Sequence, residues 1–205
     1  MNYDTYSYLW PPRPETKIPR GMLSFYEQRG WIAQKKKNGT CTVIFTNGSQ
    51  VIFKTRHYDE DHKMWQAKPE HINFFLQHGG KNGTWNVFVA ELLHNKTTHI
   101  KDHLYIFDQI VADGVQLVKM TFMERQLLLR QLGGTFTDDC YMISPFISIS
   151  HCFTSGFVKM FDTLKPEDEG LVLKDPNARL KPCYRGNSNA SWQVKSRLPH
   201  KNYSY

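Results

Sequence analysis

Apolar residues occur along the chain in short runs whose spacing predicts strands. Residues 40–46 (TCTVIFT) and 49–55 (SQVIFKT) are rich in β-branched residues and flank Asn47-Gly48. Asn-Gly between two such runs is a strong short-range signal for a β-hairpin. The other predicted strands span residues 85–93, 104–111, 140–150, 170–174 and 191–195, with an Asp113-Gly114 turn after the second of these.

Helical spacing of apolar residues is found in fewer places. Residues 120–134 show it and end in Gly-Gly, which predicts a helix with a defined stop, and residues 154–170 predict a short helix followed by an acidic turn. The first 22 residues hold four of the ten prolines, so residues 1–25 predict an extended N-terminal arm. We expect a single α+β domain over residues 1–205, with mostly antiparallel sheets and flanking helices.

Composition limits the classes of binding partner and the cellular compartment that we expect. The formal net charge of +7 favours a polyanionic partner such as a nucleic acid. No apolar stretch approaches the roughly 18 residues that a membrane helix needs, and the start of the chain lacks the layout of a signal peptide. The four cysteines are widely spaced, which favours reduced thiols and an intracellular protein, either in the cytoplasm of a bacterium or phage-infected cell or in a nucleus.

Several charged residues and one aromatic residue are candidates for a catalytic or ligand-binding site. Each has an ordinary alternative when taken alone: a solvated turn, a carboxylate at a strand edge, a buried aromatic or a charged strand end. In chain order they are Lys36 in K-K-N-G, Glu91 in F-V-A-E-L-L, Phe107 in Y-I-F-D, Glu169 and Lys174 in E-G-L-V-L-K, and Lys195 in W-Q-V-K.

The joint order of these motifs resembles that of the covalent nucleotidyltransferase superfamily, which comprises ATP-dependent DNA ligases, RNA ligases and mRNA capping enzymes. The resemblance runs from about residue 30 to residue 197. Residues 105–132 look most like the DNA ligase branch, because an F-D strand, a D-G turn and an E-R…L helix follow one another there. The resemblance therefore implies an adenylation domain of the ligase type, with roles in DNA repair or replication.

The resemblance also implies a role for each candidate residue. Lys36 would be the nucleophile that forms lysyl-AMP with ATP, and Mg²⁺, or Mn²⁺ in its place, would be the metal ion. The other implied roles are adenine recognition by Gln34, stacking on adenine by Phe107, contact of Arg56 with the nucleotide or a 5′-phosphate, ribose or metal binding by Glu91, metal binding by Glu169, and neutralisation of phosphate charge by Lys174 and Lys195.

A lysine amine must lose its proton before it can attack phosphorus, and its ordinary pKa is about 10.4. We expect the flanking cations Lys35 and Lys37 to lower the pKa of Lys36, because like charges disfavour the protonated form. We expect Gly39 to let the backbone pass close to the nucleotide without a Cβ clash.

The sequence departs from the family pattern at three positions. Asn38 replaces the usual Asp, Cys41 stands where DNA ligases often have a ribose-binding Arg, and Gln193 takes the first slot of a K-x-K motif. Lys195 and Arg197 are an alternative pair for that motif. The chain stops soon afterwards, so no C-terminal oligonucleotide-binding barrel is expected within it.

The leading interpretation is an ATP-dependent DNA ligase that seals nicks in duplex DNA by transferring AMP to the 5′-phosphate. An RNA ligase of the same superfamily is the nearest alternative, with RNA as the partner. A nucleic-acid-binding module that has lost catalysis is an alternative from a different class. We expect a monomer with no membrane partner.

Overall fold

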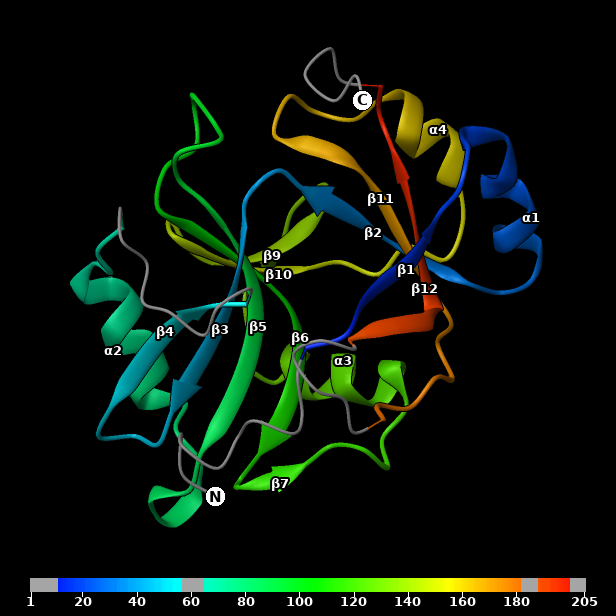
Figure 1. The fold of residues 1–205 in the computed structure, drawn as a ribbon. Helices are drawn as coiled ribbons and strands as arrows, with labels where there is room; N and C mark the ends of the chain where they lie inside the picture. Colours follow the sequence, from blue (N-terminus) through cyan, green and yellow to red (C-terminus); the bar gives the residue numbers. More distant parts are fainter. Residues whose placement is uncertain (1–10, 57–64, 182–187, 200–205) are drawn as a thin grey trace.

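The computed structural model describes residues 11–56, 65–181 and 188–199, which form two sheets with helices around and between them (Figure 1). The smaller sheet has the order β1-β12-β11-β2, and the larger has the order β4-β3-β5-β6-β10-β9-β8, with β7 paired to β6. Most neighbours are antiparallel; β1 with β12 and β10 with β6 are parallel. The predicted α+β class is confirmed.

The strands of the smaller sheet are β1 (Arg13–Lys17), β2 (Ile32–Lys37), β11 (Asp168–Lys174) and β12 (Asn189–Arg197). Those of the larger sheet are β3 (Thr40–Thr46), β4 (Val51–Thr55), β5 (Asn86–Leu93), β6 (His103–Ala112), β7 (Val115–Gln116), β8 (Thr135–Phe136), β9 (Cys140–Ser144) and β10 (Ile147–Ser150).

Period-two alternation in β3 and β5 makes both faces of the larger sheet apolar. Val43 and Val89 belong to one buried cluster, whereas Ile44 and Phe88 belong to another on the opposite face. Helix α2 (Pro69–Gln77) covers the second face and contributes the fully buried Phe75 to it. The predicted β3–β4 hairpin around Asn47-Gly48 is confirmed by the pairing of the two strands.

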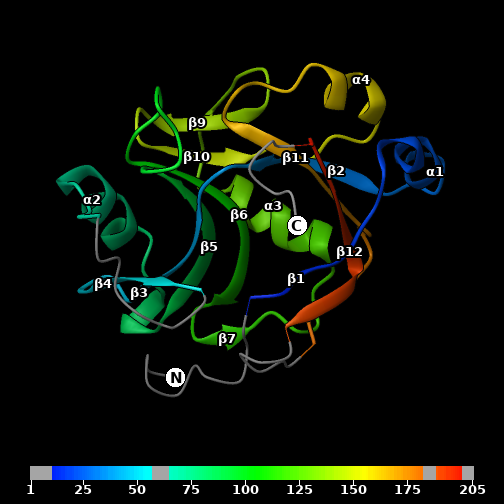
Figure 2. The same cartoon turned by 45° about the horizontal axis from the view of Figure 1, so that its top comes forward.

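Helix α3 (Phe122–Arg130) lies between the two sheets (Figure 2). Thr121 and Glu124 form a capping box at its start, in which each side chain satisfies a backbone N–H of the other. Arg125 is fully buried and donates from Nε and Nη2 to the two carboxylate oxygens of Asp108 on β6, at 2.8 and 2.9 Å. On the same side of the helix, Phe122 packs against Trp192 of β12, and the Arg125 guanidinium lies 5.4 and 5.8 Å from the centres of these two rings. The helix thereby connects the sheets.

Helices α1 (Leu23–Gln28) and α4 (Phe157–Asp162) cover one face of the smaller sheet (Figure 1). Leu23 and Phe157 pack there against Leu171, Leu173 and Val194. Short 3-10 turns, η2 (Arg20–Met22) and η3 (Lys81–Gly83), complete the described elements. The other face of this sheet is left to the polar residues of β2, β11 and β12. No helix in the described ranges is long and apolar enough to cross a membrane.

Three features differ from the sequence prediction. Residues 140–150 are not one strand, because Pro145 and Phe146 turn the chain between β9 and β10, which pair with each other. Helix α2 was not predicted. Within the predicted N-terminal arm, β1 pairs in parallel with β12, and α1 begins at Leu23; residues 1–10 of that arm lie outside the described residues.

Candidate active site

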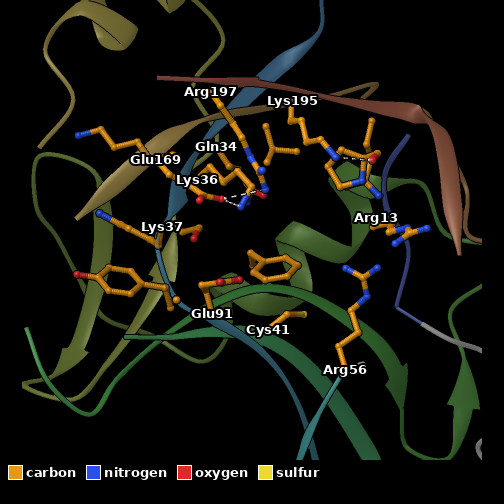
Figure 3. Close-up of a pocket in the computed structure, with 18 of the residues that line it drawn as sticks. Arg13, Gln34, Lys36, Lys37, Cys41, Arg56, Glu91, Glu169, Lys195 and Arg197 are labelled. Atoms are coloured by element: carbon orange, nitrogen blue, oxygen red, sulfur yellow. Dashed lines mark hydrogen bonds and ion pairs between the residues drawn. The ribbon is translucent and has the colours of Figure 1, made fainter. Parts of the chain in front are cut away.

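A cavity of about 320 Å³ lies between the two sheets, and side chains from both line it (Figure 3). All eight residues singled out from the sequence are among its lining residues: Gln34, Lys36, Arg56, Glu91, Phe107, Glu169, Lys174 and Lys195. Nine of its described lining residues are lysine or arginine and two are acidic; two of the nine, Lys35 and Lys37, turn their ammonium groups away from it toward Asp139 and Asp168. The cavity is therefore suited to a polyanionic ligand.

Lys36 lies near the end of β2, and its ammonium group contacts the carboxylate of Glu169 on the neighbouring β11. The same carboxylate lies 3.4 Å from Arg197 Nη2. Burial, with smaller contributions from Arg197 and Lys96, lowers the pKa of Lys36 to about 8, whereas Glu91 opposes the shift. A pKa near 8 makes the free amine accessible at neutral to mildly alkaline pH.

Lys35 and Lys37 do not act on Lys36 as predicted. Successive side chains of a strand point to opposite faces, so both lie on the other side of β2. There, Lys37 Nζ is 2.8 Å from Asp168 Oδ1 and 3.1 Å from Asp139 Oδ2, and Lys35 Nζ is 3.2 Å from Asp139 Oδ2. Their charges are paired within a buried cluster, and the cations that lower the pKa of Lys36 are Arg197 and Lys96.

Gly39 allows a close approach between strands. A Cβ at this position would lie 2.4 Å from the carbonyl oxygen of Leu92 and 2.8 Å from Cγ of Glu91. The glycine therefore lets the β2–β3 connection pass against β5, which brings Lys36 and Glu91 to the same cavity. A side chain at position 39 is therefore excluded by Leu92 and Glu91. The expectation that Gly39 makes room for a nucleotide is corrected, because the close contact is with the protein itself.

A hydrogen-bonded group surrounds Phe107 in the cavity wall. Lys174 Nζ donates to Gln34 Oε1 at 2.7 Å and lies 5.1 Å from the centre of the Phe107 ring. Gln34 Nε2 donates to Gln126 Oε1 of α3 at 3.3 Å. Burial lowers the pKa of Lys174 to about 8, with Asp108 opposing the shift. One acceptor site of the Gln34 amide is thus already used by Lys174.

Two carboxylates reach the cavity from different sheets, Glu91 from β5 and Glu169 from β11 (Figure 3). Burial raises the pKa of Glu91, and Lys36 and Lys96 oppose that change. Within the described ranges, no group of three or more His, Cys, Asp or Glu side chains could hold a metal ion. The two carboxylates fit a hard divalent cation that takes its remaining oxygen ligands from phosphates and water.

Cys41 and Gln193, two of the positions that depart from the pattern noted in the sequence, both line the cavity. Cys41 pairs with Glu91 across β3 and β5, and burial together with Glu91 raises the pKa of its thiol to about 12. The Arg56 backbone N–H donates to the Cys41 carbonyl at 3.0 Å, which sets the arginine beside the position where the family has one. Gln193, Lys195 and Arg197 all face the cavity, so both alternative pairs of the last motif lie on it.

Sequence reasoning missed some of the lining residues. Lys96 lies in the loop after β5, and its Nζ donates to the Gly39 carbonyl at 2.6 Å. Gln126 of α3, which was also missed, does not line the cavity but accepts a hydrogen bond from Gln34 Nε2. Arg13 comes from β1, whose pairing partner Asn189 is far away in the chain, so no local pattern could have identified it. Arg197 was not missed, because the sequence offered it with Lys195 as an alternative pair, and two positions along a strand place both side chains on one face.

Comparisons with known proteins identify the fold. No protein-family model and no curated protein matches the sequence. Mycobacterial DNA ligase D complexed with ATP and MES superposes with a TM-score of 0.62 at 14% identity, covering 96% of this chain and 62% of that one. The ligase domain of M. tuberculosis LigD gives a TM-score of 0.61 at 14% identity, covering 96% and 61%. A structure from an analysis of Lig E DNA ligases gives 0.50 at 13% identity, covering 82% and 62%.

The chain has the fold of a DNA ligase adenylation domain. It spans less than two thirds of the length of these ligase structures. In this fold, the cavity is the space between the smaller and the larger sheet, and the K-K-N-G segment connects β2 of the smaller sheet to β3 of the larger one.

Proposed function

We propose that this protein is an ATP-dependent polynucleotide ligase that seals nicks in duplex DNA through a lysyl-AMP intermediate on Lys36. The observation that carries the proposal is the environment of Lys36. Burial lowers the pKa of this lysine to about 8, and it lies in a cavity where two carboxylates and several further cations converge. A nucleophilic amine, carboxylates for a metal ion and cations for phosphates are the groups that nucleotidyl transfer from ATP needs.

ATP would bind with its base against Phe107 and its α-phosphate next to Lys36. Gln34 would present its amide to the edge of the base, although Lys174 already donates to Gln34 Oε1, so the base must use the remaining hydrogen-bonding capacity of that amide. Lys195 and Arg56 line the same cavity and would neutralise phosphate oxygens. Mg²⁺ bound by Glu169 and Glu91 would supply positive charge to the triphosphate.

In the first step, the lone pair of Lys36 Nζ attacks the α-phosphorus. A P–N bond forms, the P–O bond to the pyrophosphate breaks, and the amine gives up its proton to solvent. Lys36 contacts Glu169 in the resting cavity, so the amine must leave this carboxylate before it attacks. Lys174 and Lys195 would stabilise the negative charge that accumulates on the phosphate oxygens in the transition state.

Two further transfers complete the reaction. An oxygen of the 5′-phosphate at the nick attacks the AMP phosphorus, the P–N bond breaks, and Lys36 regains a proton. The 3′-hydroxyl then attacks the 5′-phosphorus of the adenylylated strand, loses its proton, and AMP leaves. The net result is one new phosphodiester bond for each ATP that is cleaved to AMP and pyrophosphate.

The first test is self-labelling with ATP that carries the label on its α-phosphate, in the presence of Mg²⁺ or Mn²⁺. The wild type should retain the label after denaturation, and Lys36→Ala should not. Lys159→Ala, which removes an exposed lysine of α4, serves as the control and should label like the wild type. A wild type that stays unlabelled with every divalent ion, yet binds DNA in a salt-sensitive manner, would show a binding module without catalysis.

The second test is sealing of nicks in DNA, RNA and mixed duplexes by the labelled protein. Sealing of the DNA nick supports the proposed substrate, whereas sealing confined to RNA-containing nicks would reassign the protein as an RNA ligase. Labelling by GTP in place of ATP would instead indicate guanylyl transfer.

A further inference from the structure

Arg13 reaches the cavity from the N-terminal strand β1 (Figure 3). Its backbone N–H donates to the Ser188 carbonyl at 2.9 Å, and its Nε donates to Asn189 Oδ1 at 2.5 Å. Because Nε is engaged by a neutral amide, the guanidinium is oriented while its charge stays available. This residue has no role in the nucleotidyl transfer described above.

Arg56, which directly follows β4 of the larger sheet, approaches Ser188 from the other side. Its Nη2 donates to Ser188 Oγ at 3.4 Å, and Ser188 is buried. Lys195 on β12 donates from Nζ to the carbonyl of Pro14, the residue after Arg13, at 3.4 Å. Two cations from strands β1 and β12 and one that follows β4 are therefore held around one side of the cavity, while Lys36, Glu169 and Arg197 lie together on another (Figure 3).

Among the described residues, no carboxylate compensates these three cations. Within the part of the chain that the structure describes, Arg13, Arg56 and Lys195 form no ion pair, in contrast to Lys36, Lys37 and Arg197. Burial lowers the pKa of Lys195, and Arg197, Arg13, Arg56 and Lys17 add to that effect. Arg56 Nε is also buried and lacks a hydrogen-bond partner among the described residues. Mutual repulsion and an unsatisfied donor are both relieved by an anion with several oxygen acceptors.

We propose that Arg13 is a further phosphate-binding residue of this cavity, and that it binds directly, beside Arg56 and Lys195, a phosphate group other than the α-phosphate at Lys36. The inference rests on the proposed function. The ligand chemistry is a phosphate group with free terminal oxygens, which suits a pair of guanidinium groups. Two sources share this chemistry: the pyrophosphate part of ATP and the 5′-phosphate of the nicked strand.

The experiment starts from protein that has been adenylylated and freed of ATP, and it has two arms. In one arm, pyrophosphate is added and the formation of ATP is followed as a function of pyrophosphate concentration. In the other arm, DNA with a 5′-phosphorylated nick is added and the single-turnover transfer of AMP is followed as a function of DNA concentration. The variants are Arg13→Ala and Arg13→Lys.

Two matched controls separate phosphate binding from a structural role. Asn189→Ala removes the hydrogen-bond partner of Arg13 but leaves the guanidinium, and Arg29→Ala removes an exposed arginine of equal charge that stacks on Phe25 outside the cavity. We expect Arg13→Ala to raise the half-saturating concentration in at least one arm by about 10- to 100-fold, the range for a charge-assisted hydrogen bond. Arg13→Lys should show a smaller loss, and both controls should stay within about twofold of the wild type.

An effect in the pyrophosphate arm identifies the ATP tail as the ligand, and an effect in the DNA arm identifies the 5′-phosphate. The proposal is overturned if Arg13→Ala behaves like the wild type in both arms, or if Asn189→Ala reproduces its loss in full. Pyrophosphate and the nicked duplex are also titrated against unreacted wild type and Arg13→Ala by calorimetry. A wild type that forms no lysyl-AMP would then refute the proposed function while the phosphate site is still decided by these titrations.

Discussion

Lys36 and Lys37 are consecutive residues of β2, yet their ammonium groups lie in opposite environments. Lys36 faces the cavity and contacts Glu169, whereas Lys37 faces away from it and lies 2.8 Å from Asp168 and 3.1 Å from Asp139. Burial lowers the pKa of Lys36 to about 8. Burial alone would also lower the pKa of Lys37, but Asp168, Tyr105 and Asp139 raise it instead. One lysine is thus prepared to lose its proton and the other to keep it.

The first prediction concerns the pH dependence of self-adenylation. Because the free amine is the nucleophile and the pKa of Lys36 is about 8, the single-turnover rate at saturating ATP should rise with pH up to that value and level off above it. Lys96→Met removes a cation that lowers this pKa, so its profile should move to higher pH. Lys159→Met, at an exposed position, should leave the midpoint where it is. A profile that is flat from pH 6 to pH 9 would contradict the assignment of Lys36 as a titrating nucleophile.

The second prediction separates the three consecutive lysines by stability. The side chain of Lys37 is 4% exposed and that of Asp168 is fully buried. Removing one partner of a buried ion pair leaves an uncompensated charge, so Lys37→Met should lower the free energy of unfolding by about 3–5 kcal/mol. The pKa of Lys37 is raised in the folded state, so its stabilisation is complete below the unfolded pKa of about 10.4 and is lost as pH rises toward the higher folded value.

Urea unfolding at pH 7 measures this difference, with Lys35→Met as the matched comparison. Lys35 lies 3.2 Å from Asp139 and 3.9 Å from Asp168, so it is the weaker partner of the cluster and its loss should cost only about 1 kcal/mol. Equal losses of stability in the two variants would mean that the cluster does not depend on Lys37. In the labelling assay, the remaining folded protein of both variants should still form lysyl-AMP.

Local sequence patterns predicted several strands of the fold and the residues that line the cavity. The β3–β4 hairpin follows from Asn47-Gly48, and β5 and β6 follow from their apolar runs. The eight candidate residues line one cavity because their motifs lie on strands that face it from the two sheets. The opposite orientation of Lys35 and Lys37 could also have been predicted, because alternation along a strand places neighbours on opposite faces.

Other features depend on pairing between distant segments. Arg13 reaches the cavity only because β1 adds to β12 in parallel, and the sequence near Arg13 shows proline and charge without a strand pattern. Residues 140–150 are apolar apart from serines, but Pro145 was a local sign against one continuous strand, because proline disfavours a strand interior. The pairing of β10 with β6 decides the turn at Pro145, and it is a tertiary contact.

The third prediction concerns Lys174, which is 3% exposed and donates to Gln34. Lys174→Met should lower the rate of self-adenylation by about 100-fold or more, because the variant lacks a cation that neutralises phosphate charge in the transition state. The fold should persist, since methionine fills a similar volume in a buried position. Labelling of this variant within about threefold of the wild type would exclude Lys174 from the reaction.

Stability gives an independent check on the same variant. Burial lowers the pKa of Lys174 to about 8, below its unfolded value of about 10.4. The unfolded state therefore binds more protons between these two values, and this lysine makes the wild type less stable as pH falls from about 10.4 to 8. Lys174→Met lacks that contribution. As pH falls from about 10.4 to 8, the free energy of unfolding of the variant should therefore increase relative to that of the wild type, and below about pH 8 the difference should stay constant. Urea unfolding at pH 8 and pH 10 compares the two proteins.

The last prediction explains why glutamine occupies position 193, where the family pattern has lysine. Gln193 is 3% exposed and is the cross-strand partner of Lys174, so both side chains enter the cavity from adjacent strands. In Gln193→Lys, two buried ammonium groups would face each other, which should lower the melting temperature by several degrees, for a cost of about 2 kcal/mol, without faster self-adenylation. Gln193→Met adds no charge and is the matched control, which should stay close to the wild type in both measurements. A Gln193→Lys variant that is as stable as the wild type and adenylates faster would show that Lys174 tolerates a second cation, and that the glutamine is not an adaptation to it.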